Sequence, residues 1–488
     1  MPTHSNFGEQ FHMYWHWGVA VVAVVLSLLA SGHAILRKRD PRAAIAWMGL
    51  AWLVPIGGAV LYFLFGVNRL RRQAALLRRG LQRHEVPASA GCVPEELHRH
   101  LPGHTGHLYM LARVVAGFVQ RPLLPGNRVE LLVDGDEAYP AMLESIRRAR
   151  KTVAFQIYIF DRDEIGLEFA RELGAAARRG VAVRVLIDAA GTRYSFPSIR
   201  AALKREGANH ALFLPVFPLW RMFAMNLRTH RKIMVVDGRE GYTGSINIRA
   251  GHCLKRRPRD PVQDIHFRVT GPVVAQMQEA FADDWLFTTG ESLRGEDWFP
   301  PLASAGPVLA RGIPDGPDED FEKLRWTLLG ALATARHSVH IVTPYFLPDQ
   351  ALVSALTLAA MRGVQVDILL PSQNNLPLMH WASRAMWWQV LEHGCRIWLT
   401  APPFDHSKLM IVDGCWVLLG SANWDPRSLR LNFEYNLECY DVELAARSER
   451  LVAARKGTAH EVTLAEADQR TFPCRLRDGI ARLLMPYL

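Results

Sequence analysis

The chain has 488 residues, of which 49% are hydrophobic, and a formal net charge of +10. This length is enough for two or three domains with hydrophobic cores. The six cysteines are scattered without CxxC spacing, which argues against a zinc site and a disulfide framework and favours a reducing compartment. The positive charge would suit nucleic acid, anionic lipid or a phosphorylated substrate, and composition does not choose among them.

Two apolar runs open the chain, at about residues 17–36 and 43–65. Each has about the 20 residues that a helix needs to cross the hydrocarbon core of a bilayer. No basic segment precedes the first run, and the second run follows at once. Both features favour a membrane hairpin over residues 1–72 rather than a cleaved signal peptide. The segment after the second run is richer in arginine than the loop between the runs, which predicts that the rest of the chain lies in the cytoplasm.

After a connector over residues 73–125, strands and helices alternate, which predicts an α/β fold. Strands are expected at 129–133, 153–160 and 183–187, with helices at 138–150 and 166–179. The same order recurs with helices at 321–336 and 351–362 and strands at 339–342 and 366–370. The repeat predicts two similar halves, 126–298 and 299–488, with their boundary in the Pro/Gly-rich stretch 299–317.

Each half carries the pattern His-x-Lys-x4-Asp. The two copies comprise His230, Lys232 and Asp237, and His406, Lys408 and Asp413. In each copy a short apolar strand separates the lysine from the aspartate, and a Gly-Ser-x-Asn segment follows that ends at Asn247 in the first half and Asn423 in the second. A histidine and a lysine two residues apart on an extended segment project to the same face. We therefore expect both faces to meet around one bound group.

Two imidazoles, two ammonium groups and two carboxamides suit a phosphodiester. The lysines and asparagines would bind the non-bridging oxygens as charge develops. One neutral histidine would attack phosphorus, and the other would donate a proton to the leaving alkoxide and then accept one from the incoming hydroxyl. Lysine supplies the positive charge, so neither a metal nor another cofactor is expected. Asp237 and Asp413 each precede a glycine, and the pattern suits a turn residue as well as a supporting group in the site.

Four segments resemble the bacterial cardiolipin synthases of the phospholipase D superfamily, whose members repeat the HKD motif. They are AAIAWMGLAWLVP at 43–55 followed by Phe65-Gly66, NLRTHRK at 226–232, TPYF at 343–346, and the long run from Phe404 to Glu434. The resemblance implies two phospholipase D-like α/β halves that share one active site at their interface, preceded by a transmembrane helical hairpin. It also implies a bacterial inner-membrane enzyme that joins two phosphatidylglycerols into cardiolipin and releases glycerol.

The resemblance further implies that a carboxylate downstream of each motif orients a histidine. Glu434 fits that role for His406, and Asp264 is the corresponding acid of the first half. By the same analogy His230 is the nucleophile. A basic insert at 255–259 departs from the shorter, acidic segment of many relatives, which leaves the identity of the second substrate open. The expected partners are phospholipids and a membrane, and not nucleic acid.

Alternative activities use the same residues. A phospholipase D-type hydrolase or nuclease would use water as the acceptor, and a cardiolipin synthase could use phosphatidylethanolamine as the donor. A non-enzymatic scaffold is disfavoured because no histidine or lysine of the motifs is missing. Aromatic residues at 212–223, including Trp220 and Phe223, and at 376–391 could form an apolar rim beside the site or could fill the core.

Overall fold

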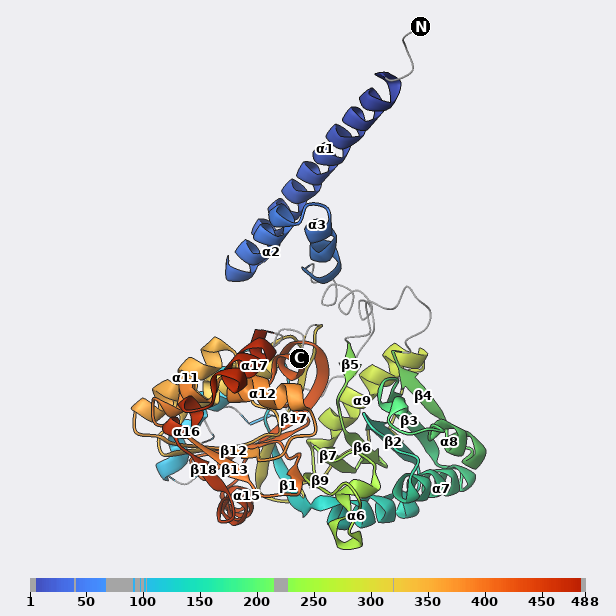
Figure 1. The fold of residues 1–488 in the computed structure, drawn as a ribbon. Helices are drawn as coiled ribbons and strands as arrows, with labels where there is room; N and C mark the ends of the chain where they lie inside the picture. The colour runs from blue at the N-terminus through green and yellow to red at the C-terminus, as the bar shows by residue number, and fades with distance from the viewer. Residues whose placement is uncertain are drawn as a thin grey trace. The chain divides into compact units, whose positions relative to one another are not determined.

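The computed structural model describes residues 6–38, 41–66, 91–92, 97, 101, 103–214, 227–318 and 320–483. The chain divides into two compact units, residues 1–73 and 74–488 (Figure 1).

The N-terminal unit contains the two apolar runs. The first run forms α1 (Asn6–Arg37), whose segment Tyr14–Arg37 is long and apolar enough to cross a membrane. The second run does not form one helix of the expected length: α2 (Pro41–Leu53) ends before Pro55, and α3 (Gly57–Leu61) and a π-helical turn (Tyr62–Gly66) follow. A proline inside such a run removes a helix hydrogen bond and disfavours the helical conformation of the residue before it. Among the described residues, α1 alone has the length of a membrane span.

The second run nevertheless packs against the first. Small side chains, namely Ala30, Ala34, Ala51 and Ala59, are buried between the segments. The Ser27 hydroxyl donates a hydrogen bond of 2.7 Å to the carbonyl of Ala51. Close contact through small residues, reinforced by single polar contacts, is typical of helices that associate in membranes.

The second unit, residues 74–488, which we call the catalytic unit because it carries both His-x-Lys-x4-Asp motifs, is built on one long sheet with an internal repeat. From its edge toward the centre the first half contributes β4 (His210–Phe213), β3 (Ala182–Asp188), β2 (Thr152–Ile157), β6 (Ile233–Val236), β7 (Glu240–Gly244), β9 (Ile265–Thr270) and β1 (Leu124–Val133). From the centre outward the second half contributes β10 (Val308–Asp315), β17 (Asn432–Tyr440), β16 (Trp416–Gly420), β15 (Leu409–Val412), β11 (Ser338–Val342), β12 (Gln365–Pro371), β13 (Arg396–Thr400) and β18 (His460–Val462). The two series mirror each other about the antiparallel pair β1–β10.

The helices repeat as well (Figure 1). The parallel strands β2, β3 and β4 are linked by α7 (Glu164–Arg178) and α8 (Arg200–Glu206), and the parallel strands β11, β12 and β13 by α11 (Gln350–Met361), α12 (Pro377–Arg384) and α13 (Trp387–Leu391). The helices α6 (Asp134–Arg148) and α10 (Lys323–Thr334) precede each series, and α9 (Val274–Thr289) and α15 (Val442–Lys456) follow β9 and β17. The predicted fold of two similar α/β halves is confirmed.

The predicted connector is in part a structural element of the catalytic unit. A 3-10 helix (Gly103–Leu108) leads into α5 (Tyr109–Ala116). Leu108, Leu111 and Val115 are fully buried and belong to the hydrophobic core of the second half. The stretch 299–317, in which the boundary between the halves was predicted, contains β10, which lies at the centre of the sheet.

Two short strand pairs cross between the halves. In the first, β5 (Arg228–Thr229) pairs in parallel with β17, with Arg228 opposite Asn432 and Thr229 opposite Phe433. In the second, β14 (Phe404–Asp405) pairs in parallel with β8 (Val262–Gln263). Each crossing strand ends directly before a motif histidine.

Candidate active site

The two crossing strand pairs hold the motif histidines at the interface of the halves. The His230 amide donates a 2.8 Å hydrogen bond to the Phe433 carbonyl, and the His406 amide donates a 2.9 Å hydrogen bond to the Gln263 carbonyl. Each histidine is thus anchored by the backbone of the opposite half, as expected for one site shared between the halves.

The same pairing decides which carboxylate orients which histidine, and it reverses the expectation. Glu434 follows Phe433 on β17, so its carboxylate oxygens lie 3.0 and 3.1 Å from His230 Nδ1. Asp264 follows Gln263, and its Oδ2 lies 2.8 Å from His406 Nδ1. The assignment of Glu434 to His406, and of Asp264 to the first-half histidine, is therefore wrong. Each acid serves the histidine of the other half.

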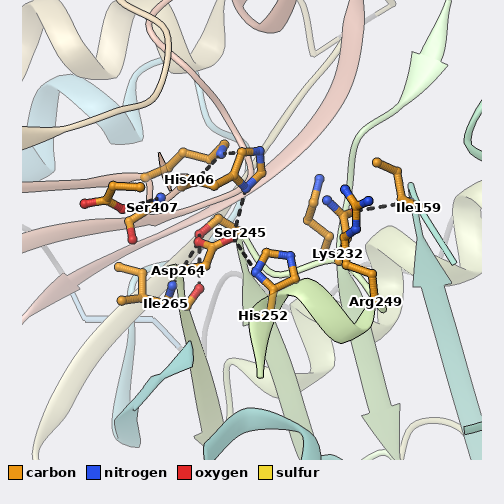
Figure 2. A network of polar contacts seen from close by, with 12 residues as sticks. Ile159, Lys232, Ser245, Arg249, His252, Asp264, Ile265, His406 and Ser407 are labelled. Carbon is orange, nitrogen blue, oxygen red and sulfur yellow. Dashed lines mark hydrogen bonds and ion pairs between the residues drawn. The ribbon is translucent and has the colours of Figure 1, made fainter. Parts of the chain in front are cut away.

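Both carboxylates are fully buried and receive further hydrogen bonds. Ser421 Oγ donates to Glu434 Oε2 at 2.5 Å, and Asn432 Nδ2 donates to Glu434 Oε1 at 3.1 Å. Ser245 Oγ and the amide of Ile265 donate to Asp264 Oδ1. Figure 2 shows Asp264 between Ser245, His406 and His252. Burial would raise the pKa of each acid, but the contacting histidine and the nearby lysine outweigh it, with Ser421 adding to the effect at Glu434, and the pKa of each is lowered.

The backbone conformation and the lack of space for a side chain explain why a glycine precedes each of these serines. Gly244 and Gly420 have φ angles of 147° and 155°, which side chains rarely adopt. A Cβ on Gly420 would lie 2.4 Å from Asn436 Oδ1, and one on Gly244 would lie 2.8 Å from His266 Nδ1. The repeated Gly-Ser pair thus brings each serine hydroxyl against the carboxylate strand.

The two lysines lie beside the histidines, as their spacing predicts. Lys232 Nζ donates to the His230 carbonyl at 2.8 Å, and Lys408 Nζ donates to the His406 carbonyl at 2.5 Å and lies 3.1 Å from His406 Nε2. Burial lowers the pKa of Lys232 to about 7 and that of Lys408 to about 8, although the carboxylates oppose the shift. Lys408 adds to the lowering of the pKa of Lys232, so the two buried amino groups lie close enough to interact. Two neighbouring buried cations attract an anion.

Both imidazoles are neutral in the empty site. Burial lowers the pKa of His230 to about 4 and that of His406 to about 3, and lysines from both halves add to each shift. The carboxylate on Nδ1 directs the lone pair to Nε2 in each ring. Among the described residues His230 Nε2 has no hydrogen-bond partner, whereas His406 Nε2 contacts Lys408. The two rings are therefore not equivalent.

The two asparagines of the Gly-Ser-x-Asn segments are also not equivalent. Asn247 Oδ1 accepts a 3.1 Å hydrogen bond from the Ile159 amide, which leaves its NH2 group to donate. Asn423 Nδ2 donates to Ser428 Oγ at 3.3 Å, and Asn423 Oδ1 is buried with no hydrogen-bond partner in the described part of the chain. In the described part of the chain, both N–H groups of Asn247 are therefore left to donate to a phosphate oxygen, whereas Ser428 engages one of the two N–H groups of Asn423.

The aspartates of the motifs lie elsewhere. Four-residue strands, β6 and β15, separate them from the lysines, a distance of about 13 Å or more. Asp237 accepts hydrogen bonds from the amides of Arg150, Lys151 and Thr152. Asp413 accepts from the amides of residues 336–338 and from His107 Nε2 at 2.7 Å. Of the two roles that the pattern left open, the structure therefore favours the turn residue over a supporting group in the site, because both aspartates bind turn amides at the far ends of the strands.

His252 is a further imidazole near the site that the sequence analysis missed. It is 1% exposed, its Nδ1 lies 3.8 Å from Asp264 Oδ2, and its ring centroid lies 6.5 Å from that of His406. The repeat gave no signal for it, because the offset of the motifs places Ser428 at the equivalent position of the second half. Ser245 and Ser421 did carry a signal, the repeated Gly-Ser pair.

The expected aromatic rim is only partly covered by the structure. Trp220, Phe223 and the rest of 215–226 lie outside the described residues, while Phe213 is buried and packs against Phe433. In the run 376–391, Met379, Trp387 and Val390 are buried in the core. The same run exposes Leu376 and Trp388, at 47% and 40%, so it is divided between core and surface. The basic insert is mostly exposed, and its Arg256 pairs with Glu164 at 3.0 Å.

Among the described residues, no group of three or more His, Cys, Asp or Glu side chains is placed to hold a metal ion. Lys232 and Lys408 supply positive charge to the shared site.

Comparison with known proteins agrees with this architecture. A family model described as "Cardiolipin synthase, PLD-like domain" matches residues 142–285 and 328–454, and one described as "Phospholipase_D-nuclease N-terminal" matches residues 25–66. A phosphatidylserine synthase structure from Haemophilus influenzae Rd KW20 covers 78% of this chain and 100% of its own, with a TM-score of 0.62 and 16% sequence identity. That structural likeness establishes the shared fold.

Curated relatives are more similar in sequence. Cardiolipin synthase A of Pseudomonas fluorescens (strain SBW25) is 33% identical over 468 residues, covering 95% of this chain and 96% of the relative. The cardiolipin synthase of Geobacillus kaustophilus (strain HTA426) is 30% identical, covering 98% of this chain and 94% of the relative. The chain belongs to the cardiolipin synthase family of phospholipase D-like phosphatidyltransferases.

Proposed function

We propose that the enzyme transfers a phosphatidyl group from one phosphatidylglycerol to another and releases glycerol. The observation that carries this proposal is the pair of non-equivalent His–Lys sites, each with a carboxylate from the opposite half. The full-length similarity to cardiolipin synthases supports the choice of lipid. An enzyme that uses one nucleophile and one acid–base group needs two histidines in different environments.

In the first step, the Nε2 lone pair of His230 attacks phosphorus. Glu434 holds the Nδ1 proton and stabilises the imidazolium that forms. The bond between phosphorus and the headgroup glycerol oxygen breaks, and that oxygen takes a proton from His406 Nε2. The bound phosphodiester supplies the negative charge that raises the pKa of His406 enough for it to carry this proton. Glycerol leaves, and the phosphatidyl group remains on His230.

In the second step, His406 Nε2 accepts the proton of a glycerol hydroxyl from a second phosphatidylglycerol. The resulting oxygen attacks phosphorus, the bond to His230 Nε2 breaks, and cardiolipin forms. Lys232, Lys408 and the NH2 group of Asn247 would bind the non-bridging oxygens in both steps. Asp264 holds His406 in the required tautomer throughout.

The decisive experiment is incubation of the purified enzyme with defined lipid mixtures and mass analysis of both products. Phosphatidylglycerol alone should yield cardiolipin and glycerol in equal amounts. Phosphatidic acid as the main product would identify a hydrolase. Release of ethanolamine from a mixture of phosphatidylethanolamine and phosphatidylglycerol would identify phosphatidylethanolamine as the donor.

We further propose that the enzyme is a multi-pass protein of the bacterial inner membrane with its catalytic halves in the cytoplasm. The packing of residues 41–66 against α1 supports a second crossing, and the excess of arginine after the second run supports the orientation. Reporter fusions at the C-terminus would test this. A fusion that is active in the periplasm and silent in the cytoplasm would contradict the orientation.

A further inference from the structure

The second half carries a C-terminal extension that the first half lacks. After α15 the chain forms β18, α16 (Leu464–Asp468) and α17 (Phe472–Leu483), beyond the end of the family match at residue 454. Figure 1 shows α17 on the outside of the second half beside α12, against which it packs. The extension therefore adds a surface helix to a fold that is otherwise complete.

One face of α17 is apolar and exposed. Phe472, Leu476, Ile480 and Leu483 are 76%, 52%, 54% and 72% exposed. Their spacing of four, four and three residues places them on a single stripe of an α-helix. We call these four residues the apolar stripe.

The stripe lies opposite the face that holds the helix to the protein. Asp478 and Ala481 are buried against the second half. Because successive residues rotate by about 100°, their side chains project to the other side of the helix from Leu476. A helix that only packs on a protein turns its apolar face inward, whereas α17 is attached by a buried carboxylate and presents its stripe outward.

Positive charge surrounds this helix. Arg475 and Arg482 are exposed beside the stripe. Asp478 is paired with Arg470 and with Arg477 at 2.7 Å, and Arg384 lies 3.9 Å away. Three guanidinium groups thus share one buried carboxylate.

The arginines around Asp478 also border a cavity. Arg384, Arg470 and His380 line a cavity of about 300 Å³ beside α12 and α16, together with one acidic residue, Glu466. Burial and the nearby Arg384 lower the pKa of Arg470. An anion in this cavity would relieve the repulsion between these cations.

We propose that α17 is an interfacial helix that lies in the headgroup region of an anionic membrane. The apolar stripe enters the boundary between headgroups and acyl chains, and the flanking arginines bind lipid phosphates. An exposed apolar face bordered by arginine is the pattern of a helix that lies in a membrane surface. The inference rests on the proposed function in one respect, because it supposes that the catalytic unit works on lipids in a bilayer.

A spin label on α17 in the full-length enzyme tests the location directly. Leu476→Cys is labelled with a nitroxide after the partly exposed Cys92 and Cys474 are replaced by serine, since the other cysteines are buried. In vesicles containing phosphatidylglycerol, the label should be more accessible to oxygen than to a water-soluble nickel complex. A matched label at Met361→Cys on α11, where the native side chain is 69% exposed, should be more accessible to nickel. A nickel-accessible label at position 476 would overturn the proposal.

Kinetics provide a second measurement. The double variant Leu476→Ser/Ile480→Ser should raise the apparent KM for vesicle-borne lipid by about tenfold, with kcat and thermal midpoint little changed. The control Leu358→Ser/Met361→Ser removes a pair that is 58% and 69% exposed on α11 and should leave the KM unchanged. A fall in thermal midpoint with unchanged KM would mean that the stripe is structural and would refute the proposal.

A second copy of the chain is the competing occupant of the stripe. If label mobility and molecular mass in detergent both depend on protein concentration, the stripe is a dimer interface and the proposal fails. The label measurement needs no turnover, so a wrong choice of lipid donor would change the kinetic arm and leave the position of α17 as measured.

Discussion

The exchange of carboxylates between the halves makes a sharp kinetic prediction. Glu434 contacts His230 Nδ1 at 3.0 and 3.1 Å and also accepts hydrogen bonds from Ser421 and Asn432. Glu434→Gln keeps the shape of the side chain but removes its charge and turns one oxygen into a donor that faces other donors. We expect it to impair His230, whereas Asp264→Asn should impair His406.

The expected magnitude follows from these contacts. A hydrogen bond to a charged group contributes about 1.5–3 kcal/mol, which is a factor of about 10–10² in rate at about 1.4 kcal/mol per tenfold. If the amide also stabilises the wrong tautomer of the ring, the loss reaches about 10⁴-fold. Formation of the phosphohistidine should therefore slow by about 10–10⁴-fold in Glu434→Gln.

The assay uses a phosphatidyl ester of 4-nitrophenol, whose leaving group needs no proton. Asp264→Asn should release the first equivalent of 4-nitrophenol within about tenfold of the wild-type rate and then stall, because His406 must still activate the acceptor. His406→Ala should behave similarly, and Glu434→Gln should show no burst. A full burst in Glu434→Gln together with a lost burst in Asp264→Asn would refute the exchanged pairing and His230 as the nucleophile.

Three further predictions concern pH, metal and the motif aspartates. The pKa is about 7 for Lys232 and about 8 for Lys408. We therefore expect kcat/KM to decline as pH rises through this range, because the free enzyme loses its ammonium groups. A value of kcat/KM that rises up to pH 9 would contradict this. Activity should survive exhaustive chelation, and inactivation by EDTA that a stoichiometric metal reverses would show otherwise. Asp237→Asn and Asp413→Asn should lower the free energy of unfolding by about 1–3 kcal/mol, with the larger loss at Asp413 because it also pairs with His107. Denaturant unfolding beside specific activity checks this, and a stable but inactive variant would restore a catalytic role.

Local patterns in the sequence were sufficient for the repeat, the α/β fold and the motif histidines and lysines. Period-two spacing places His230 and Lys232 on one face of an extended segment whatever surrounds it. The Gly-Ser pairs also reflect a local requirement, because Gly244 and Gly420 occupy backbone conformations that side chains rarely adopt. Such features depend on residues that are close in the sequence, and they can therefore be predicted from the sequence alone.

Only the tertiary structure determines which carboxylate contacts which histidine. Glu434 orients His230, and Asp264 orients His406, because β5 pairs with β17 and β14 pairs with β8. These pairings join segments on opposite halves, and no local spacing encodes which of two similar strands lies beside which. Asp413 likewise has the place of a catalytic residue in the motif, yet the length of β15 carries it to a turn held by His107.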